Sequence, residues 1–153
     1  MASPLRIEYA NACYHVPNRG TNRTQIFHED EHYQLFIAKL GEFSELYKLK
    51  IFCFCFMPNH FHIYLQTPRT NLSLFMQSFL TSFCVSYNKK RRSSGHLFQG
   101  RFKSHLVESQ LYHSKLSRYI HLNPVRTTQI KPFSTEEKRD YLKNLVICAL
   151  KNA

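Results

Sequence analysis

Apolar residues recur along this chain with two spacings, one typical of strands and the other typical of helices. Runs and alternations of apolar residues predict four strands, at Ile7–Pro17, Ile51–Phe56, Phe61–Gln66 and Phe102–Leu106. Apolar residues at helical spacing predict three helices, the first starting near Glu29, the second capped by Thr70 or Asn71, and the third covering Leu111–Leu122. The chain therefore mixes strands and helices along its length.

The order strand, helix, two strands, helix, strand predicts an α+β fold. We expect an antiparallel sheet of the ferredoxin-like or split βαβ kind, with helices on one face. The third helix should end near Asn123, because a residue that precedes proline avoids the α region. After Pro132 the composition turns polar, and Thr135–Leu150 predicts a separate C-terminal helix. We therefore divide the chain into a domain at 1–131 and a C-terminal helical extension at 132–153.

Charge is distributed unevenly along the chain. The formal net charge is +11, and between Leu46 and Thr135 thirteen Lys and Arg residues accompany a single acid, Glu108. Positive charges that lie close together repel one another in the folded chain unless a polyanion binds against them. Nucleic acid is therefore the favoured partner. A membrane surface is disfavoured, because no segment combines a basic amphipathic face with lipid-seeking aromatic residues.

The scarcity of acids excludes one class of nuclease. Enzymes that use two metal ions hold them with several carboxylates. This chain has two Asp residues, Asp30 and Asp140, and its basic middle offers only Glu108. An active site built on a carboxylate triad is therefore not expected.

The cysteines and the hydropathy pattern indicate a reducing compartment. The five cysteines (Cys13, Cys53, Cys55, Cys84 and Cys148) cannot all pair, and none forms a CxxC motif, so we expect reduced structural thiols. No apolar run approaches the ~18 residues of a membrane span, and the first residues lack a signal-peptide core. We predict a cytoplasmic protein; its state as a monomer or a homodimer is left open.

Two histidines stand at alternate positions of a predicted strand. Alternation places His60 and His62 on one face of the strand, while Phe61 and Ile63 point to the other. Two imidazoles about 7 Å apart on a rigid strand can bind one cation from the same side. An HxH pair by itself is also common in proteins that bind no metal.

A second pair of polar residues lies near the end of the third helix. Tyr119 and Asn123 are four residues apart and so lie on one helix face. That spacing lets an amide oxygen and a phenol point to the same place. A helix-end Asn and a half-buried Tyr are ordinary structural features, and the spacing alone favours that interpretation.

Several motifs together resemble the single-tyrosine HUH transposases, and in particular the REP-associated tyrosine transposases. The resemblance rests on Met57–His62, Leu97–Lys103 and Arg118–Arg126, in the expected order. Shorter matches are Tyr14-His15-Val16, Arg19-Gly20 and Thr67-Pro68, so the similarity spans most of the chain. Thr127 departs from the small residue that is usual in this family after the final arginine.

The resemblance implies a catalytic constellation. It implies that His60 and His62 are metal ligands, Asn123 is a third ligand, and Tyr119 is the nucleophile. Two imidazoles suit zinc or manganese, whereas an amide and open water sites suit magnesium or manganese, and the resemblance favours Mg²⁺ or Mn²⁺. The implied reaction is metal-dependent cleavage of single-stranded DNA near a hairpin, through a covalent 5′-phosphotyrosine.

Basic and aromatic residues are candidates for contacts with the DNA. We expect the phosphate contacts to come mainly from Lys89, Lys90, Arg91, Arg92, Arg101, Lys103 and Arg126. Phe98 and Phe102 are candidates for stacking on bases, and Arg19, His15 and Arg23 are weaker candidates in the first loop. The remaining histidines (His28, His32, His96, His105, His113 and His121) are expected to be surface or structural residues.

An alternative function belongs to a different class. A protein with the same fold could bind repetitive palindromic DNA without cutting it. The presence of all four of His60, His62, Tyr119 and Asn123 argues against this alternative, because a disused active site has no reason to keep them together.

Overall fold

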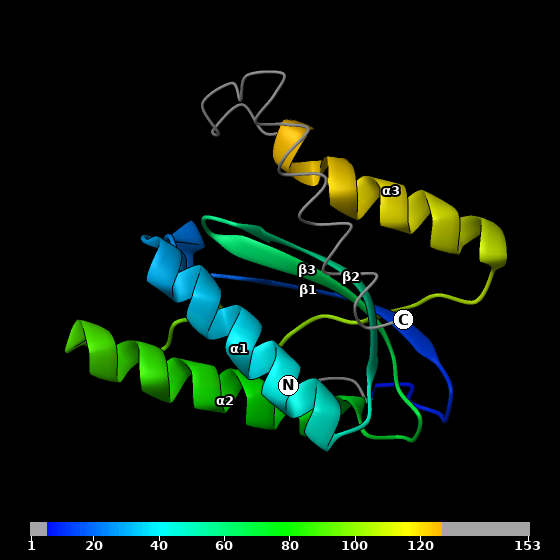
Figure 1. Ribbon diagram of the computed structural model, residues 1–153, viewed down its shortest axis with the longest axis horizontal. Coiled ribbons are helices and arrows are strands. Elements are labelled where there is room, and N and C mark those ends of the chain that lie inside the picture. The colour runs from blue at the N-terminus through cyan, green and yellow to red at the C-terminus, as the bar shows by residue number, and fades with distance from the viewer. Residues whose placement is uncertain (1–5, 127–153) are drawn as a thin grey trace.

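The computed structural model describes residues 6–126, without the side chains of residues 110–111 and 124–126 (Figure 1). Its elements are β1 (Cys13–Arg19), a 3-10 turn η1 (Thr21–Arg23), α1 (Asp30–Leu46), β2 (Lys50–Met57), β3 (His60–Gln66), α2 (Leu72–Arg91), β4 (His105–Leu106) and α3 (Gln110–Arg126). None of the helices in this part of the chain has the length and apolar content needed to cross a bilayer. The C-terminal extension predicted at 132–153 lies outside the described residues.

The strands form a four-stranded antiparallel sheet in the order β2-β3-β1-β4. Because β3 pairs antiparallel with both β1 and β2, these two strands run in the same direction, with β3 between them. This is the split βαβ arrangement of a ferredoxin-like sheet. The predicted α+β fold class is confirmed.

The two faces of the sheet carry different helices (Figure 1). α1 and α2 pack together on one face, over a core made of large apolar residues, among them Tyr14, Val16, Phe36, Phe61, Ile63, Leu65, Phe75, Phe79 and Phe83. α3 lies on the opposite face, where it contacts β2. The expectation of helices on one face therefore holds for α1 and α2, whereas α3 covers the second face.

Local sequence signals explain where the first two helices begin and end. Glu29 caps α1 in a capping box with His32, as the acidic residues at this point predicted. Asn71 is the N-cap of α2, and Arg92 ends that helix in the left-handed conformation, with its backbone N–H bonded to the Asn88 carbonyl.

Three element boundaries differ from the prediction. β1 begins at Cys13 rather than Ile7, and β4 contains only His105 and Leu106. α3 continues through Pro124 to Arg126 instead of ending near Asn123. The α-region restriction before proline is a preference that a helix can override, so Pro124 did not mark the end of this one.

A glycine holds the turn between β2 and β3 in place. Gly20 donates its backbone N–H to the Asn59 carbonyl (2.9 Å), and Ile26 donates to the Pro58 carbonyl (2.7 Å). A Cβ at Gly20 would lie 2.4 Å from the Thr24 carbonyl oxygen, so only glycine allows this close approach. The loop after β1 thereby anchors the strand that begins at His60.

Candidate active site

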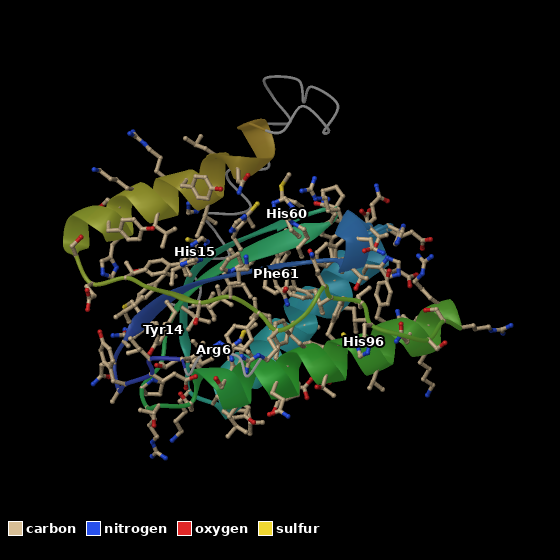
Figure 2. The ribbon with its side chains drawn as sticks, turned by 180° about the vertical axis from the view of Figure 1, so that it is seen from behind. Arg6, Tyr14, His15, His60, Phe61 and His96 are labelled. Atoms are coloured by element: carbon tan, nitrogen blue, oxygen red, sulfur yellow. The ribbon has the colours of Figure 1, made fainter. Side chains whose placement is uncertain are left out.

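The face of the sheet toward α3 carries a row of histidines. His60 and His62 of β3 lie opposite Arg19 and Pro17 of β1, and His15 lies opposite Tyr64 on the same face. Figure 2 shows His15 and His60 on the side of the sheet toward α3, and Tyr14 and Phe61 on the other side. The alternation predicted for the HxH stretch is therefore present, and it places the imidazoles away from the aromatic core.

A hydrogen-bond chain fixes the tautomer of His60. The Asn59 amide donates from Nδ2 to the Arg23 carbonyl (3.2 Å), which directs the Asn59 oxygen toward His60. His60 donates its Nδ1–H to that oxygen, at 2.7 Å. The Nε2 atom of His60 is thus the unprotonated nitrogen, which is the form that binds a metal.

His62 is hydrogen-bonded to a histidine from the neighbouring strand. Nδ1 of His62 lies 2.9 Å from Nε2 of His15, in a buried contact. The two rings are stacked, with centroids 5.1 Å apart and an angle of 18° between their planes. On its other side, the His62 ring lies 5.3 Å from that of His60, in an edge-to-face arrangement.

Burial keeps these imidazoles neutral. Burial lowers the pKa of His62 to about 3, with smaller contributions from His15, His60 and Arg19. Burial, followed by the charge of His105, lowers the pKa of His15 to about 4. The pKa of His60 is also lowered, by burial and by Arg19. At neutral pH the rings therefore present lone pairs, as metal ligands must.

α3 brings a tyrosine to the same place. The ring of Tyr119 meets the His62 ring edge to face, with centroids 5.8 Å apart, and the tyrosine is 42% exposed. The helix is held on the sheet by a small apolar cluster in which Leu116 and Ile120 pack with Cys53, Cys55, Met57, Tyr64 and Val107. The phenol is thus anchored through its helix yet open to solvent.

These residues line a cleft of about 670 Å³. Its wall contains His60, His62 and Tyr119, the cations Arg19, Arg101 and Lys103, and also Pro17, Asn18, Gln99, Gly100 and His105. The segment with Arg101 and Lys103 is held along β1 by backbone bonds from Gln99 to the Arg19 carbonyl (2.9 Å) and from Lys103 to the Pro17 carbonyl (3.2 Å). A nucleophile candidate, three imidazoles and three cations share one cleft.

A sequence model described as "Transposase IS200 like" matches residues 8–123, which include every element from β1 to most of α3. The chain belongs to the IS200-like transposase family. A search of curated proteins finds no match to it.

Two solved structures resemble this IS200-like transposase in fold. One is a REP-associated tyrosine transposase bound to a REP hairpin, with TM-score 0.67 and 20% identity, covering 95% of this chain and 88% of the other. The second is a putative transposase from Deinococcus radiodurans R1, with TM-score 0.54 and 17% identity, covering 78% of this chain and 95% of the other.

The fold brings some, but not all, of the predicted site residues together. His60, His62, Tyr119, Arg19, Arg101 and Lys103 all line the cleft. Asn123 follows Tyr119 by one turn of α3 and is buried, and it is not among the described residues that line the cleft. The side chain of Arg126 lies outside the described part of the structure.

The basic run at the end of α2 lies apart from the cleft. None of Lys89, Lys90, Arg91 and Arg92 lines it. Lys90 forms an ion pair with Glu31 of α1 at 3.2 Å, and Arg91 lies over the Tyr87 ring. Any contact that this run makes with DNA would therefore be made on the α1–α2 side of the molecule.

The rings of Phe98 and Phe102, the two predicted stacking residues, contact other side chains of the protein. Phe102 is only 8% exposed, and the Arg6 guanidinium lies 3.8 Å from its ring centroid. Phe98 packs edge to face on Phe61 and lies beside Phe83 in the core. Phe102 is therefore largely covered, whereas Phe98 is only partly buried, and stacking of either ring on bases stays a prediction.

Sequence reasoning gave too little weight to His15 and did not consider Asn59. Both hydrogen-bond to the HxH histidines, and His105 also lines the cleft. The signal for His15 was its position at an alternate residue of a predicted strand, but the pattern did not show which face of that strand meets His62. His121 bonds the Ser117 carbonyl within its own helix, in agreement with a structural role.

Proposed function

We propose that this IS200-like transposase cleaves single-stranded DNA beside a hairpin, with Tyr119 as the nucleophile. The observation that supports this most strongly is the contact of the Tyr119 ring with His62 in a cleft that also contains His60 and three cations. A solvent-open phenol beside neutral imidazoles is an arrangement suited to phosphoryl transfer.

The proposed reaction conserves the energy of the bond it breaks. The phenol oxygen of Tyr119 loses its proton and attacks the phosphorus, and the bond from phosphorus to the 3′ oxygen breaks. The 3′ oxygen takes a proton and leaves as a hydroxyl, while the 5′ phosphate stays on the tyrosine. Attack by a 3′-hydroxyl on this linkage reverses the step and joins strands without a nucleotide cofactor.

A divalent cation fits the donors on the sheet. His60 and His62 each use Nδ1 within the protein, so their Nε2 atoms would hold Mg²⁺ or Mn²⁺, with Asn123 as the proposed third ligand. Within the described residues, no group of three or more His, Cys, Asp or Glu side chains is arranged around one point. Amide, water and phosphate oxygens are the further ligands that suit Mg²⁺ or Mn²⁺. When bound, such an ion neutralises the negative phosphate.

The cations of the cleft are suited to bind the DNA backbone. Arg19, Arg101 and Lys103 line it together with Tyr119, so a phosphate placed there meets positive charge on the side toward β1. The REP hairpin in the structural neighbour is the basis for proposing a hairpin substrate here. Lys89 to Arg92, which lie outside this cleft, and Arg126 remain proposed contacts, and a cytoplasmic location remains a prediction.

The test is the formation of a covalent adduct. The purified chain is incubated with single-stranded hairpin oligonucleotides and Mn²⁺, and a protein–DNA species is sought on a denaturing gel. Tyr119→Phe removes the phenol oxygen but keeps the ring, so we expect adduct formation to fall to background while DNA binding is retained. The control is Tyr112→Phe on the same helix, which is exposed but lies outside the cleft.

The outcomes separate cleavage from binding alone. An adduct formed by the Tyr119→Phe protein would assign another nucleophile. Tight hairpin binding by the wild-type chain, without an adduct under any metal condition, would favour the non-cleaving alternative.

A further inference from the structure

One buried polar contact at the cleft has no role in the proposed chemical steps. His15 of β1 and His62 of β3 are both 8% exposed, and their ring nitrogens lie 2.9 Å apart. They are diagonal neighbours on the sheet, because His15 is opposite Tyr64, which is two residues beyond His62. A buried hydrogen bond between two neutral histidines has only two possible proton arrangements.

The two arrangements have opposite consequences for His62. If His15 donates from Nε2, the Nδ1 atom of His62 accepts and its proton lies on Nε2, toward the cleft. If His62 donates from Nδ1, its Nε2 atom keeps a lone pair. Only the second arrangement allows His62 to bind a metal ion beside His60.

The neighbouring histidine shows which arrangement suits the site. His60 donates Nδ1–H to the Asn59 oxygen, an atom that can only accept, so its tautomer is set by the chain. His15 occupies the corresponding position for His62, and its stacked ring, at 18° to that of His62, also restricts rotation.

We infer that His15 is a positioning residue that accepts the Nδ1–H of His62 and thereby presents the His62 Nε2 atom to a divalent cation. This inference rests on the proposed function, because it assigns a purpose to a ligand proposed there. His15 does not act as a ligand itself, since its Nε2 lone pair is used in the bond to His62. Its other neighbour is His105, whose ring centroid lies 5.8 Å away.

The first measurement uses the unmodified chain without metal. Nitrogen-15 NMR of the imidazoles at neutral pH distinguishes a protonated from an unprotonated ring nitrogen. We expect His62 to carry its proton on Nδ1, like His60. A proton on the Nε2 atom of His62 would overturn the inference, whether or not any variant folds.

The second measurement compares two substitutions by calorimetric titration with Mn²⁺ alone. His15→Phe keeps a ring in place but offers no acceptor, and we expect the Mn²⁺ dissociation constant to rise by about 10–100-fold, the range typical of outer-shell partners. His15→Gln places an amide oxygen near the position of Nε2, and we expect it to recover most of the affinity. His121→Phe changes a histidine of α3 that, within the described residues, bonds to Ser117 of its own helix, and we expect it to leave the affinity unchanged.

The results distinguish the inference from the function on which it rests. Equal affinity for His15→Phe and wild type would overturn the positioning role, as would a His15→Gln protein as weak as His15→Phe. A wild-type chain that binds no Mn²⁺ but carries the Nδ1 proton on His62 would contradict the proposed metal site and leave the tautomer assignment standing.

Discussion

The two faces of the sheet use the same strands for different purposes. Toward α1 and α2, β1 and β3 present Tyr14, Val16, Phe61 and Ile63, all buried in one continuous apolar core. Toward α3, the alternate residues of the same strands include His15, His60 and His62, and the buried apolar cluster there is small and contains Cys53 and Cys55.

Neighbouring residues of one strand thus serve different purposes, because one side chain points to the folding core and the next to the proposed active site. The aromatic face contributes the large buried area that drives folding. The polar face carries side chains whose burial is costly unless each is hydrogen-bonded, and His60 and His62 each have such a partner. A substitution at Phe61 should therefore affect mainly folding, whereas one at His60 or His62 should affect mainly the reaction.

The largest expected effect is on the polar face. His60→Ala and His62→Ala should each remove detectable adduct formation. Loss of one of two imidazole ligands should lower the metal affinity by more than the ~100-fold that is typical of a change in an outer-shell residue. Excess Mn²⁺ should restore little. The measurement is adduct yield on a denaturing gel, with Mn²⁺ titration calorimetry alongside; unchanged metal affinity in both variants would return these residues to a structural role.

The position between them should behave in the opposite way. Phe61 is fully buried, and Phe61→Ala should lower the free energy of unfolding by about 3–5 kcal/mol through loss of packing and a residual cavity. Val85→Ala on the exposed side of α2 is the control, with an expected change within about 0.5 kcal/mol. Urea denaturation followed by circular dichroism measures both. A Phe61→Ala protein as stable as the control would contradict the division of labour between the faces.

A third comparison concerns cations in two regions. Replacing Arg101 and Lys103 by glutamine should weaken binding to single-stranded hairpin DNA by about tenfold and reduce the salt slope by about 0.7 for each phosphate that is no longer neutralised. Replacing Lys89 and Arg92 at the end of α2 should have a smaller effect, since neither lines the cleft. Fluorescence anisotropy at several salt concentrations measures both slopes. Equal losses of affinity would place the DNA path across both faces.

The smallest effect is expected at the cysteines of the α3 face. Burial raises the pKa of Cys53 to about 11 and that of Cys55 to about 12, so both thiols stay protonated as the pH rises through 8 and 9. Alkylation by iodoacetamide at pH 8 should be slow in the folded chain and fast in urea. Of Cys13, Cys53 and Cys55, only Cys13 is partly exposed, and it should react before the other two. Rapid native modification of Cys55, followed by mass spectrometry, would contradict the burial of that face.

The sequence predicted the elements well where local signals are strong. The capped start of α1 at Asp30, the two strands around the Met57–His60 turn and the long apolar stripe of α2 all follow from short-range patterns. The fourth strand was predicted at Phe102–Leu106, but its restriction to His105 and Leu106 was not, and neither was the passage of α3 through Pro124. The length of β4 depends on its pairing with β1, a contact across the sheet that no local pattern reveals.

The sequence predicted those parts of the candidate site that depend on a single segment, but not the contacts between segments. The HxH alternation gave the shared face of His60 and His62, and the family resemblance brought Tyr119 to it. The partnership of His15 with His62 needed the register of β1 on β3, and the contacts of Phe98 and Phe102 with the core needed the tertiary structure.

The long-range pairing of β1 with β3 also sets the time at which this cleft can form. The hydrogen bond between His15 and His62 joins residues 47 positions apart, whereas the hairpin of β2 and β3 closes through a short turn. Non-local strand pairing is slow because the chain loses loop entropy before contacts compensate. During synthesis, the β2–β3 hairpin with His60 and His62 is completed before Tyr119 is added to the chain, because these residues come earlier in the sequence. A growing polypeptide consequently carries the proposed metal ligands His60 and His62 before it carries Tyr119, the proposed nucleophile, and the proposed site is complete only in the finished domain.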